Sequence, residues 1–524
     1  MLASGMVHLH AYDYAAIGCY FLITTAIAIW VSRARPDSED LFLAGRSLGP
    51  IAVGFSLFSA NVSSDTLIGL PGAAYVSGIA VANYEWMAGV VLLFTVFFVT
   101  PILMRARVTT MPELMERRFD PRLRKYLAAV TLFLSVVLDT AATMYAGALV
   151  TITFIPGLEL WQVCLVIALF TGAYTAAGGL RAVVYTEILQ AIVLLGGAGL
   201  LAYLVFGRFD YSWQAVVDAA RPRDLSLVRP LDDATLPWLG LITGVPIVGF
   251  YYWTMNQYVI QRVLGARDVE TAGRAALIAA TLKLLPLFLM VLPGVMAVSL
   301  LPNLEHADSV FPTMVATFAP DGVRGLILAG LIAALMSTVS ATLNASATLI
   351  TMDFIQPRRP DWDSHRLARV GRIVTLLMAL VAAAWAPMIR HFEGLWSYLQ
   401  QVFAFVASPL VATFLMGLWV RRLGAGAALR GLISGHVLSA LLFAAREFGW
   451  VSLHFTVIGG VLFAATAALT FLWMQALGEA DRPRDDDPRL ALVSRRGLAG
   501  VSVAVRTGAI VVLGLIVGLV IAFR

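Results

Sequence analysis

Apolar runs of about 20 residues recur along this whole chain and leave few folds open to it. A run of that length, coiled as a helix, spans roughly the 30 Å hydrocarbon core of a bilayer. The 524-residue chain is 60% hydrophobic and 13% charged, whereas about 25% of the residues of a soluble domain are charged. The sequence therefore predicts an all-α polytopic membrane protein, which crosses the lipid bilayer many times.

The apolar runs predict fourteen transmembrane spans. They lie near residues 12–31, 50–71, 78–104, 125–153, 160–179, 184–206, 235–257, 274–300, 323–351, 370–390, 395–419, 425–446, 451–474 and 504–522. The first run is too long for the apolar region of a signal peptide and is followed by Arg33 and Arg35. We therefore expect it to be an uncleaved anchor.

The arginines predict the orientation of the chain, because basic residues concentrate in cytoplasmic loops. They gather in the loops after odd-numbered spans, for example Arg105 to Lys125, Arg358 and Arg359, and Arg421 and Arg422. The segment 207–234 also carries arginines, but long loops weigh less in this rule. We expect the protein to lie in the cell's inner (plasma) membrane, with both termini on the outer side. The same bias accounts for the net charge of +5, so we expect no nucleic-acid partner.

A polar cluster interrupts the second predicted span. The stretch SLFSANVSSDTLIGLPG, residues 56–72, places Asn61, Ser63, Ser64, Asp65 and Thr66 between apolar neighbours. Polar side chains at membrane depth are costly, and they usually mark a pathway or a binding site.

Lys283 also lies at membrane depth, and it needs a partner. It is one of only two lysines, the other being Lys125 in a predicted cytoplasmic loop. Glu85 and Asp139 are its candidate partners, because apolar residues flank each of them. The pair either belongs to a functional site or simply holds two helices together.

Two spans look discontinuous. The second has its polar cluster, and the seventh carries Gly244, Pro246 and Gly249 at mid-membrane. Proline removes a helical hydrogen bond, so freed carbonyl groups can face a cavity. For either span alone a simple kink would suffice. Their spacing of five spans, however, favours two inverted five-helix repeats with a site between them at the midplane.

These repeats suggest a division of the chain into five parts. They are an extra helix and cytoplasmic linker (1–45), the first repeat (46–206), an extracellular loop (207–234), the second inverted repeat (235–420), and C-terminal helices with a cytoplasmic loop (421–524). The ninth span adds the adjacent hydroxyls of Ser337 and Thr338 in the second repeat. Together with the carbonyls of an unwound helix, such hydroxyls can bind a hard monovalent cation without adding net charge.

Five stretches of the chain together resemble a known family. They read SANVSSDTLIGLPGAAYVSGIAVANYEWM, TAAGGLRAVVYTEILQ, YYWTMNQYVIQRVLGA, LKLLPLFLMVLPG and STVSATLNASATLITMDF. In order and spacing they resemble the sodium:solute symporter family, and most of all its sodium/glucose (galactose) cotransporter branch. The resemblance runs from about residue 40 to 420. It implies a leucine-transporter-type inverted-repeat core with about 14 transmembrane helices.

The resemblance also implies a sodium site and a solute site. For Na⁺ it implies the backbone carbonyls of Ser59, Val62 and Ala334 and the hydroxyls of Ser337 and Thr338. For a sugar it implies contacts at Asn61, Thr66, Glu85, Asp139, Gly249, Lys283 and Gln400, and an aromatic gate of Tyr252 and Trp253. Thr66, Ala88, Gly249 and Asp139 stand where the family has glutamine, serine, asparagine and asparagine. Glu187 stands where close relatives have aspartate.

The function expected from these features is transport: a sodium-coupled symporter that imports a sugar or a related polyhydroxylated solute by alternating access. A proton-coupled symporter, or one for an amino acid or a carboxylate, is the alternative within the same family. An enzyme is not expected, because the chain has no HExxH, GxSxG or Cys/His cluster. A sensor with an appended signalling domain is not expected either, because the chain ends at Arg524 directly after its last span. No obligate protein partner is evident.

Asp139 is the departure with the largest chemical consequence. If Lys283 faces both Glu85 and Asp139, one of the two carboxyl groups has no counter-charge of its own. Asp139 is then either protonated, so that it donates a hydrogen bond as an asparagine would, or ionised, so that it selects a solute with an amine. A third possibility is that it faces a water-filled vestibule and matters little.

Overall fold

The computed structural model describes residues 9–31, 37–154, 157–233, 235–304, 306–391, 395–479 and 501–523. These residues form helices and no β-strand. The prediction of an all-α protein is therefore confirmed for the part of the chain that the structure describes.

The helices fall into three groups along the chain, and η denotes the shorter 3₁₀ or π segments. The first group is α1 (Ala11–Val31), α2 (Ser38–Leu43), η1 (Ala44–Arg46), α3 (Pro50–Asn61), α4 (Ser64–Ser77), η2 (Gly78–Val81), α5 (Ala82–Phe98), α6 (Thr100–Ala106), α7 (Met111–Arg118), α8 (Pro121–Phe133), η3 (Leu134–Thr140), α9 (Ala141–Phe154) and α10 (Leu160–Phe206).

The second group is η4 (Gly207–Phe209), α11 (Trp213–Ala219), η5 (Pro222–Leu225), α12 (Trp238–Ile242), α13 (Gly244–Phe250), η6 (Tyr251–Met255), α14 (Gln257–Leu264), α15 (Val269–Leu282), η7 (Leu287–Val291), α16 (Leu292–Leu300), η8 (Ala307–Ser309), α17 (Val310–Phe318), α18 (Val323–Thr348), η9 (Leu349–Ile355) and η10 (Gln356–Arg358). The last group is α19 (Ser364–Trp385), η11 (Ala386–His391), α20 (Leu395–Trp419), α21 (Ala425–Glu447), α22 (Phe455–Ala476) and α23 (Val503–Ala522).

Several helices begin at an acidic cap that the sequence supplies locally. Asp120, Asp268 and Asp363 accept backbone N–H bonds in the first turns of α8, α15 and α19. A side-chain oxygen at this position satisfies amides that have no helical partner. The caps therefore account for where these helices start.

Within the described residues, eleven helices are long and apolar enough to cross a membrane. The predicted number of fourteen spans is not confirmed, and the difference has physical causes. Helix α10 has 47 residues and would be about 70 Å long if it were straight. Gly179, however, has φ 57° and ψ −153°. The run is thus two helical segments that meet where two spans were predicted. Other predicted spans are divided into helices too short to count.

The two spans that were expected to be discontinuous are indeed broken. The second consists of α3 and α4, which are separated at Val62 and Ser63. The seventh consists of α12, α13 and η6, and an extended residue, Asn256, precedes α14. Val62, Ser63 and Asn256 are buried, so a cavity or neighbouring side chains can satisfy the backbone groups freed there.

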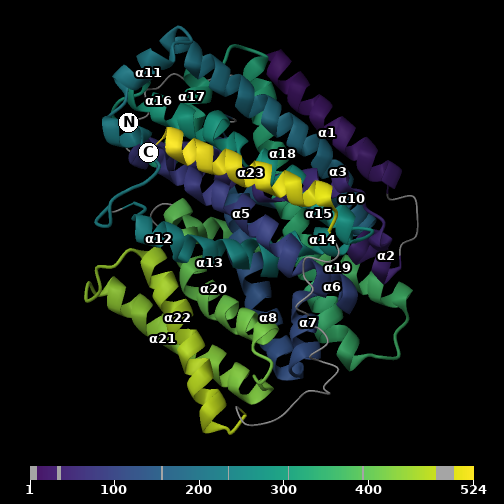
Figure 1. Cartoon of the computed structure of the whole chain (residues 1–524). Helices are drawn as coiled ribbons and strands as arrows, with labels where there is room; N and C mark the ends of the chain where they lie inside the picture. The colour runs from purple at the N-terminus through teal and green to yellow at the C-terminus, as the bar shows by residue number, and fades with distance from the viewer. Residues whose placement is uncertain are drawn as a thin grey trace.

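Figure 1 shows how the helices are arranged. Helices α21 and α22 lie together at one edge beside α20, α1 lies at the opposite edge, and α23 crosses over α5 and α15. Helices α3, α10 and α18 contact one another inside the bundle. The broken helix α3–α4 therefore packs directly against α18, the helix that carries Ser337 and Thr338.

The segment predicted as a long loop is 207–234, and its described residues, 207–233, are folded onto the end of the bundle. Asn83 donates from Nδ2 to the carbonyl of Leu227 at 2.8 Å, and Arg229 donates to the carbonyl of Ser77 at 2.6 Å. Arg229 is buried. These contacts fix the segment over the junction of α4 and α5.

Candidate functional site

A polar cavity lies between the two broken helices. The space free of protein atoms measures about 800 Å³, including the part open to solvent. It is lined by Asn61, Ser63, Thr66, Tyr84, Glu85, Ala88, Asp139, Thr143, Val245, Val248, Gly249, Tyr252, Trp253, Tyr258, Thr338, Leu399, Gln400 and Phe403. Six of the seven residues expected to contact a solute are in this lining, and so are both residues of the expected gate.

The break between α3 and α4 presents its polar groups to this cavity. The backbone amide of Ser63 donates to the carbonyl of Asn61 at 3.1 Å, two residues back instead of the four of a helix. The hydroxyl of Thr66 donates to the same carbonyl at 3.2 Å. Ser64 donates to the carbonyl of Thr143 at 2.9 Å, which ties the break to α9. The polar cluster that the sequence placed in this span thus forms the break itself.

Lys283 lies behind the cavity wall and is not among the residues that line it. Its side chain is buried, and its ammonium group contacts the carboxylate of Glu85 and the side-chain oxygen of Asn61. The ammonium nitrogen also lies 5.3 Å from the ring centroid of Trp253, within the range of a cation–π contact. Lys283 therefore holds cavity residues in place, whereas a direct contact with the solute was expected from the sequence.

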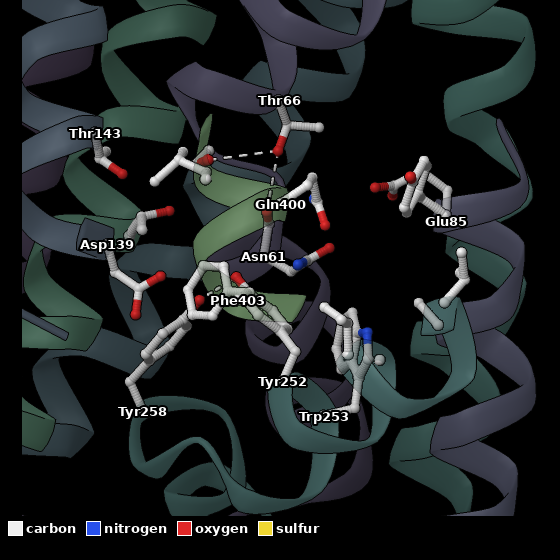
Figure 2. Close-up of a pocket in the computed structure, with 18 residues that line it drawn as sticks. Asn61, Thr66, Glu85, Asp139, Thr143, Tyr252, Trp253, Tyr258, Gln400 and Phe403 are labelled. Atoms are coloured by element: carbon white, nitrogen blue, oxygen red, sulfur yellow. Dashed lines mark hydrogen bonds between the residues drawn. The ribbon is translucent and has the colours of Figure 1, made fainter. Parts of the chain in front are cut away.

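Of the two partners considered for Lys283, the structure selects Glu85. Asp139 lies on the other side of the cavity from Glu85, near Thr143 and Tyr258 (Figure 2). Its carboxyl group accepts a hydrogen bond from Nδ2 of Asn256 at 3.4 Å. The expectation that Lys283 faces two carboxyl groups is thus wrong. The reason is that η3, which carries Asp139, and α5, which carries Glu85, approach the cavity from opposite sides.

Aromatic side chains form one wall of the cavity. Tyr252 and Trp253 lie in η6, and their rings meet edge to face with centroids 5.6 Å apart. The hydroxyl of Tyr258 donates to that of Tyr252, and Phe403 packs against Tyr252 from α20 (Figure 2). Such a wall offers apolar faces, which suit the C–H face of a sugar ring.

The residues expected to bind Na⁺ come from the end of α3 and the middle of α18. All five are buried: Ser59, Val62, Ala334, Ser337 and Thr338. The hydroxyl of Ser59 donates to that of Ser337 at 2.9 Å. Thr338 donates to the carbonyl of Ala60 at 3.0 Å. The structure therefore brings the end of α3 into contact with Ser337 and Thr338, where carbonyl and hydroxyl oxygens are the available ligands.

A buried ion pair lies next to these residues. Glu187 of α10 pairs with Arg262 of α14, and both side chains are at most 1% exposed. The hydroxyl of Ser56 donates to Glu187, and the hydroxyl of Ser337 lies 3.4 Å from it. Glu187 thus joins α3 and α14 to α18. The sequence marked it only as a departure from the family, without a partner.

Several lining residues were missed by reading the sequence. Tyr84 precedes Glu85, Thr143 lies one helical turn after Asp139, and Tyr258 lies in the same motif as Tyr252. Their proximity to the expected residues could have identified these three. Leu399 and Phe403 lie equally close to Gln400, but their residue type gives no signal, because apolar residues are expected throughout a membrane helix.

Comparison with known proteins agrees with the family resemblance seen in the sequence. The profile of the sodium:solute symporter family matches residues 41–435. A sodium/glucose cotransporter of Vibrio parahaemolyticus is 33% identical over 457 residues, which cover 80% of this chain and 83% of that protein. A sodium/mannose cotransporter of Bos taurus is 34% identical over 466 residues, which cover 82% of this chain and 78% of that protein.

The fold is also similar to a solved structure. The substrate-bound, outward-open structure of a Na⁺-coupled sialic acid symporter superposes with a TM-score of 0.78 at 23% identity. The match covers 89% of this chain and 98% of the other. At that level of identity the likeness concerns the fold. It agrees with the expected architecture of an inverted-repeat transporter core.

Proposed function

The chain belongs to the sodium:solute symporter family, and on that premise we propose that it uses the inward flow of Na⁺ to import a sugar or a related polyhydroxylated solute. Its family consists of transporters and not of enzymes. Alternating access is the mechanism that fits a site at the interface of two repeats in the middle of the membrane.

One observation carries the proposal: Thr338 lies at the cavity and also contacts the end of α3. It lines the cavity, and its hydroxyl contacts the carbonyl of Ala60 in the last turn of α3. The same short break has Asn61 and Thr66 at the cavity, and just before it the hydroxyl of Ser59 contacts Ser337 of α18. A cation bound between α3 and α18 would therefore fix the wall of the solute site, which is what coupling requires.

Na⁺ would be held by neutral oxygens. The proposed ligands are three backbone carbonyls and two hydroxyls, from Ser59, Val62, Ala334, Ser337 and Thr338. Because the amide of Ser63 donates to Asn61, the carbonyl of Ser59 does not receive the bond that a continuous helix would give it. This freed carbonyl and the hydroxyl of Ser337 suit a hard monovalent cation.

The solute would be held by the polar lining of the cavity. Asn61, Glu85 and Gln400 offer donors and acceptors, and Lys283 supports the first two from behind. Thr66, Asp139 and Gly249 complete the proposed contacts, and Tyr252 with Trp253 would close the site as a gate. A buried hydrogen-bonding group discriminates strongly against a solute that leaves it unpaired.

The organisation of the chain is part of the proposal. We assign residues 46–206 and 235–420 to the two repeats, and the remaining segments to additional helices and loops. The protein is an integral, multi-pass membrane protein. The arginine bias supports placing both termini outside the plasma membrane.

Uptake into proteoliposomes tests the function. The purified protein would be supplied with radiolabelled sugars, polyols and sugar acids under an inward Na⁺ gradient, an equal K⁺ gradient, or a pH gradient. We expect at least one hydroxylated solute to accumulate only under the Na⁺ gradient. Accumulation driven by the pH gradient alone would identify the proton-coupled alternative, for which Asp139 in the cavity would be the first candidate carrier.

A further inference from the structure

Helix α18 begins at a cap that a different helix supplies. Its own N-cap residue, Gly322, has no side chain that could accept a bond. Asp13, in the first turn of α1, instead accepts the backbone N–H groups of Gly322 at 2.8 Å and Gly325 at 2.6 Å. Both bonds end on the same oxygen, Oδ1. The other oxygen accepts the amide of His10 at 2.8 Å.

Glycines at the start of α18 allow Asp13 to approach the helix closely. Asp13 is fully buried. A Cβ atom on Gly325 would lie 2.3 Å from the Cα atom of Asp13, so only glycine fits there. Gly322 has φ 82°, a conformation that glycine adopts readily and other residues rarely do. The start of α18 is thus shaped around Asp13, in contrast to α8, α15 and α19, whose caps are local.

A second contact lies further along the same two helices. The hydroxyl of Tyr20 in α1 donates to the sulfur of Met336 in α18 at 3.5 Å and lies 3.4 Å from Nε2 of Gln190 in α10. Met336 immediately precedes Ser337. Helix α1 therefore contacts α18 at its first turn and beside the proposed sodium ligands.

We propose that Asp13 is a positioning residue for the sodium site. By capping α18 from α1, it fixes where α18 lies along its axis, and hence where Ser337 and Thr338 face the end of α3. This role rests on the proposed function, because it presumes that α18 carries sodium ligands.

The step from the cap to the site follows from the stiffness of a helix. Ser337 lies twelve residues after Gly325, about 18 Å along the helix axis. No proline interrupts α18, so a shift at its first turn is transmitted along its length. A binding site keeps its affinity only while its ligands stay within about 0.5 Å of their proper positions. Loss of the cap should therefore weaken sodium binding more than it lowers the maximal rate.

The test is the sodium dependence of uptake by the full-length protein in proteoliposomes. For Asp13→Ala we expect the half-saturating Na⁺ concentration to rise by roughly threefold to tenfold, in line with what an N-cap contributes. Asp13→Asn keeps an oxygen for both glycine amides but places an amide donor against His10, so a smaller rise is expected. If Asp13→Ala does not reach the membrane, Asp13→Asn carries the test.

Asp363→Ala is the matched control. Asp363 caps α19 through an N–H bond from Arg366 at 2.7 Å, and no proposed sodium ligand lies on α19. Its removal should leave the sodium dependence unchanged. An equal rise in both variants, or no rise in either Asp13 variant at normal abundance, would overturn the inference while the proposed function stands. A parent protein without sodium-dependent uptake would overturn both.

Hydrogen exchange supplies a readout that does not depend on transport. Backbone amides of residues 322–330 should exchange faster in Asp13→Ala than in the parent protein, because the first turn of α18 loses its cap. In Asp363→Ala the same amides should exchange as in the parent. Unchanged exchange at 322–330 in Asp13→Ala would show that Asp13 does not hold α18.

Discussion

Replacing Lys283 by methionine should destabilise the protein severely, and a second substitution should separate that effect from transport. The side chains of Lys283 and Glu85 are 1% and 7% exposed, and the ammonium group also contacts Asn61. Without Lys283, the carboxylate of Glu85 keeps its burial and loses its ion-pair partner. Breaking a buried pair in this way costs about 3–5 kcal/mol. We therefore expect Lys283→Met to be scarce in the membrane.

Replacing both charges should restore much of that stability. Two apolar side chains of similar size often substitute for a buried ion pair at little net cost. The double variant Lys283→Met with Glu85→Leu should thus recover abundance and thermal stability relative to Lys283→Met alone. Uptake should not recover, because Glu85 lines the cavity and its hydrogen bonds to the solute would be missing.

Two measurements test these expectations for the Lys283 variants: the melting temperature of the purified protein and the half-saturating solute concentration in proteoliposomes. A Lys283→Met variant that is as stable and as active as the parent would refute the reasoning about the buried pair. A double variant with the solute affinity of the parent would show that the pair serves only to hold the helices.

Three further outcomes are expected. Ser337→Ala and Thr338→Val should each raise the half-saturating Na⁺ concentration by roughly fivefold, because a lost neutral ligand costs about 1 kcal/mol. Thr375→Val removes a buried hydroxyl that bonds only its own helix and should not change sodium activation. The same half-saturating Na⁺ concentration in Ser337→Ala, Thr338→Val and Thr375→Val would contradict the sodium assignment. Asp139→Leu should abolish uptake because it removes a polar group from the cavity lining, whereas Asp139→Asn keeps a hydrogen-bonding group there and should retain uptake; an Asp139→Leu variant with the uptake of the parent would show that Asp139 does not hold the solute. A deoxy analogue of the best solute should bind at least about tenfold more weakly at some ring position, and a best solute without hydroxyls would rule out the sugar assignment.

The sequence predicted the features that depend on the bilayer itself. Runs of about 20 apolar residues indicated helices, because the hydrocarbon core sets that length. The polar cluster around Asn61 correctly indicated one broken helix. The glycines near Pro246 indicated the second, although its interruptions lie on either side of them, at Thr243 and Asn256. The number of spans was harder to predict. Gly179 divides α10 by its backbone conformation, and composition does not reveal the φ value of a glycine.

The sequence could not identify most of the residue pairs that join different helices of the bundle. It identified Lys283 as needing an acidic partner and gave two candidates, and only the three-dimensional packing selects Glu85. The ion pair of Glu187 with Arg262 joins residues 75 positions apart, and Asp13 caps a helix more than 300 positions away. Neither pair leaves a local pattern in the sequence. The separation of the two residues along the chain depends on how different helices pack, and not on the periodicity of a single helix.

A measurement of whether solute flux drives Na⁺ flux tests the proposed symport most directly. Proteoliposomes without an imposed ion gradient would be given an inward gradient of the transported solute, and the entry of radiolabelled Na⁺ would be measured. We predict that the solute gradient drives Na⁺ inward, and that Thr338→Val reduces this flux at limiting Na⁺ while Thr375→Val does not. Solute entry that moves no Na⁺, or Na⁺ entry that is the same with and without solute, would contradict a symport carried by the site between α3 and α18.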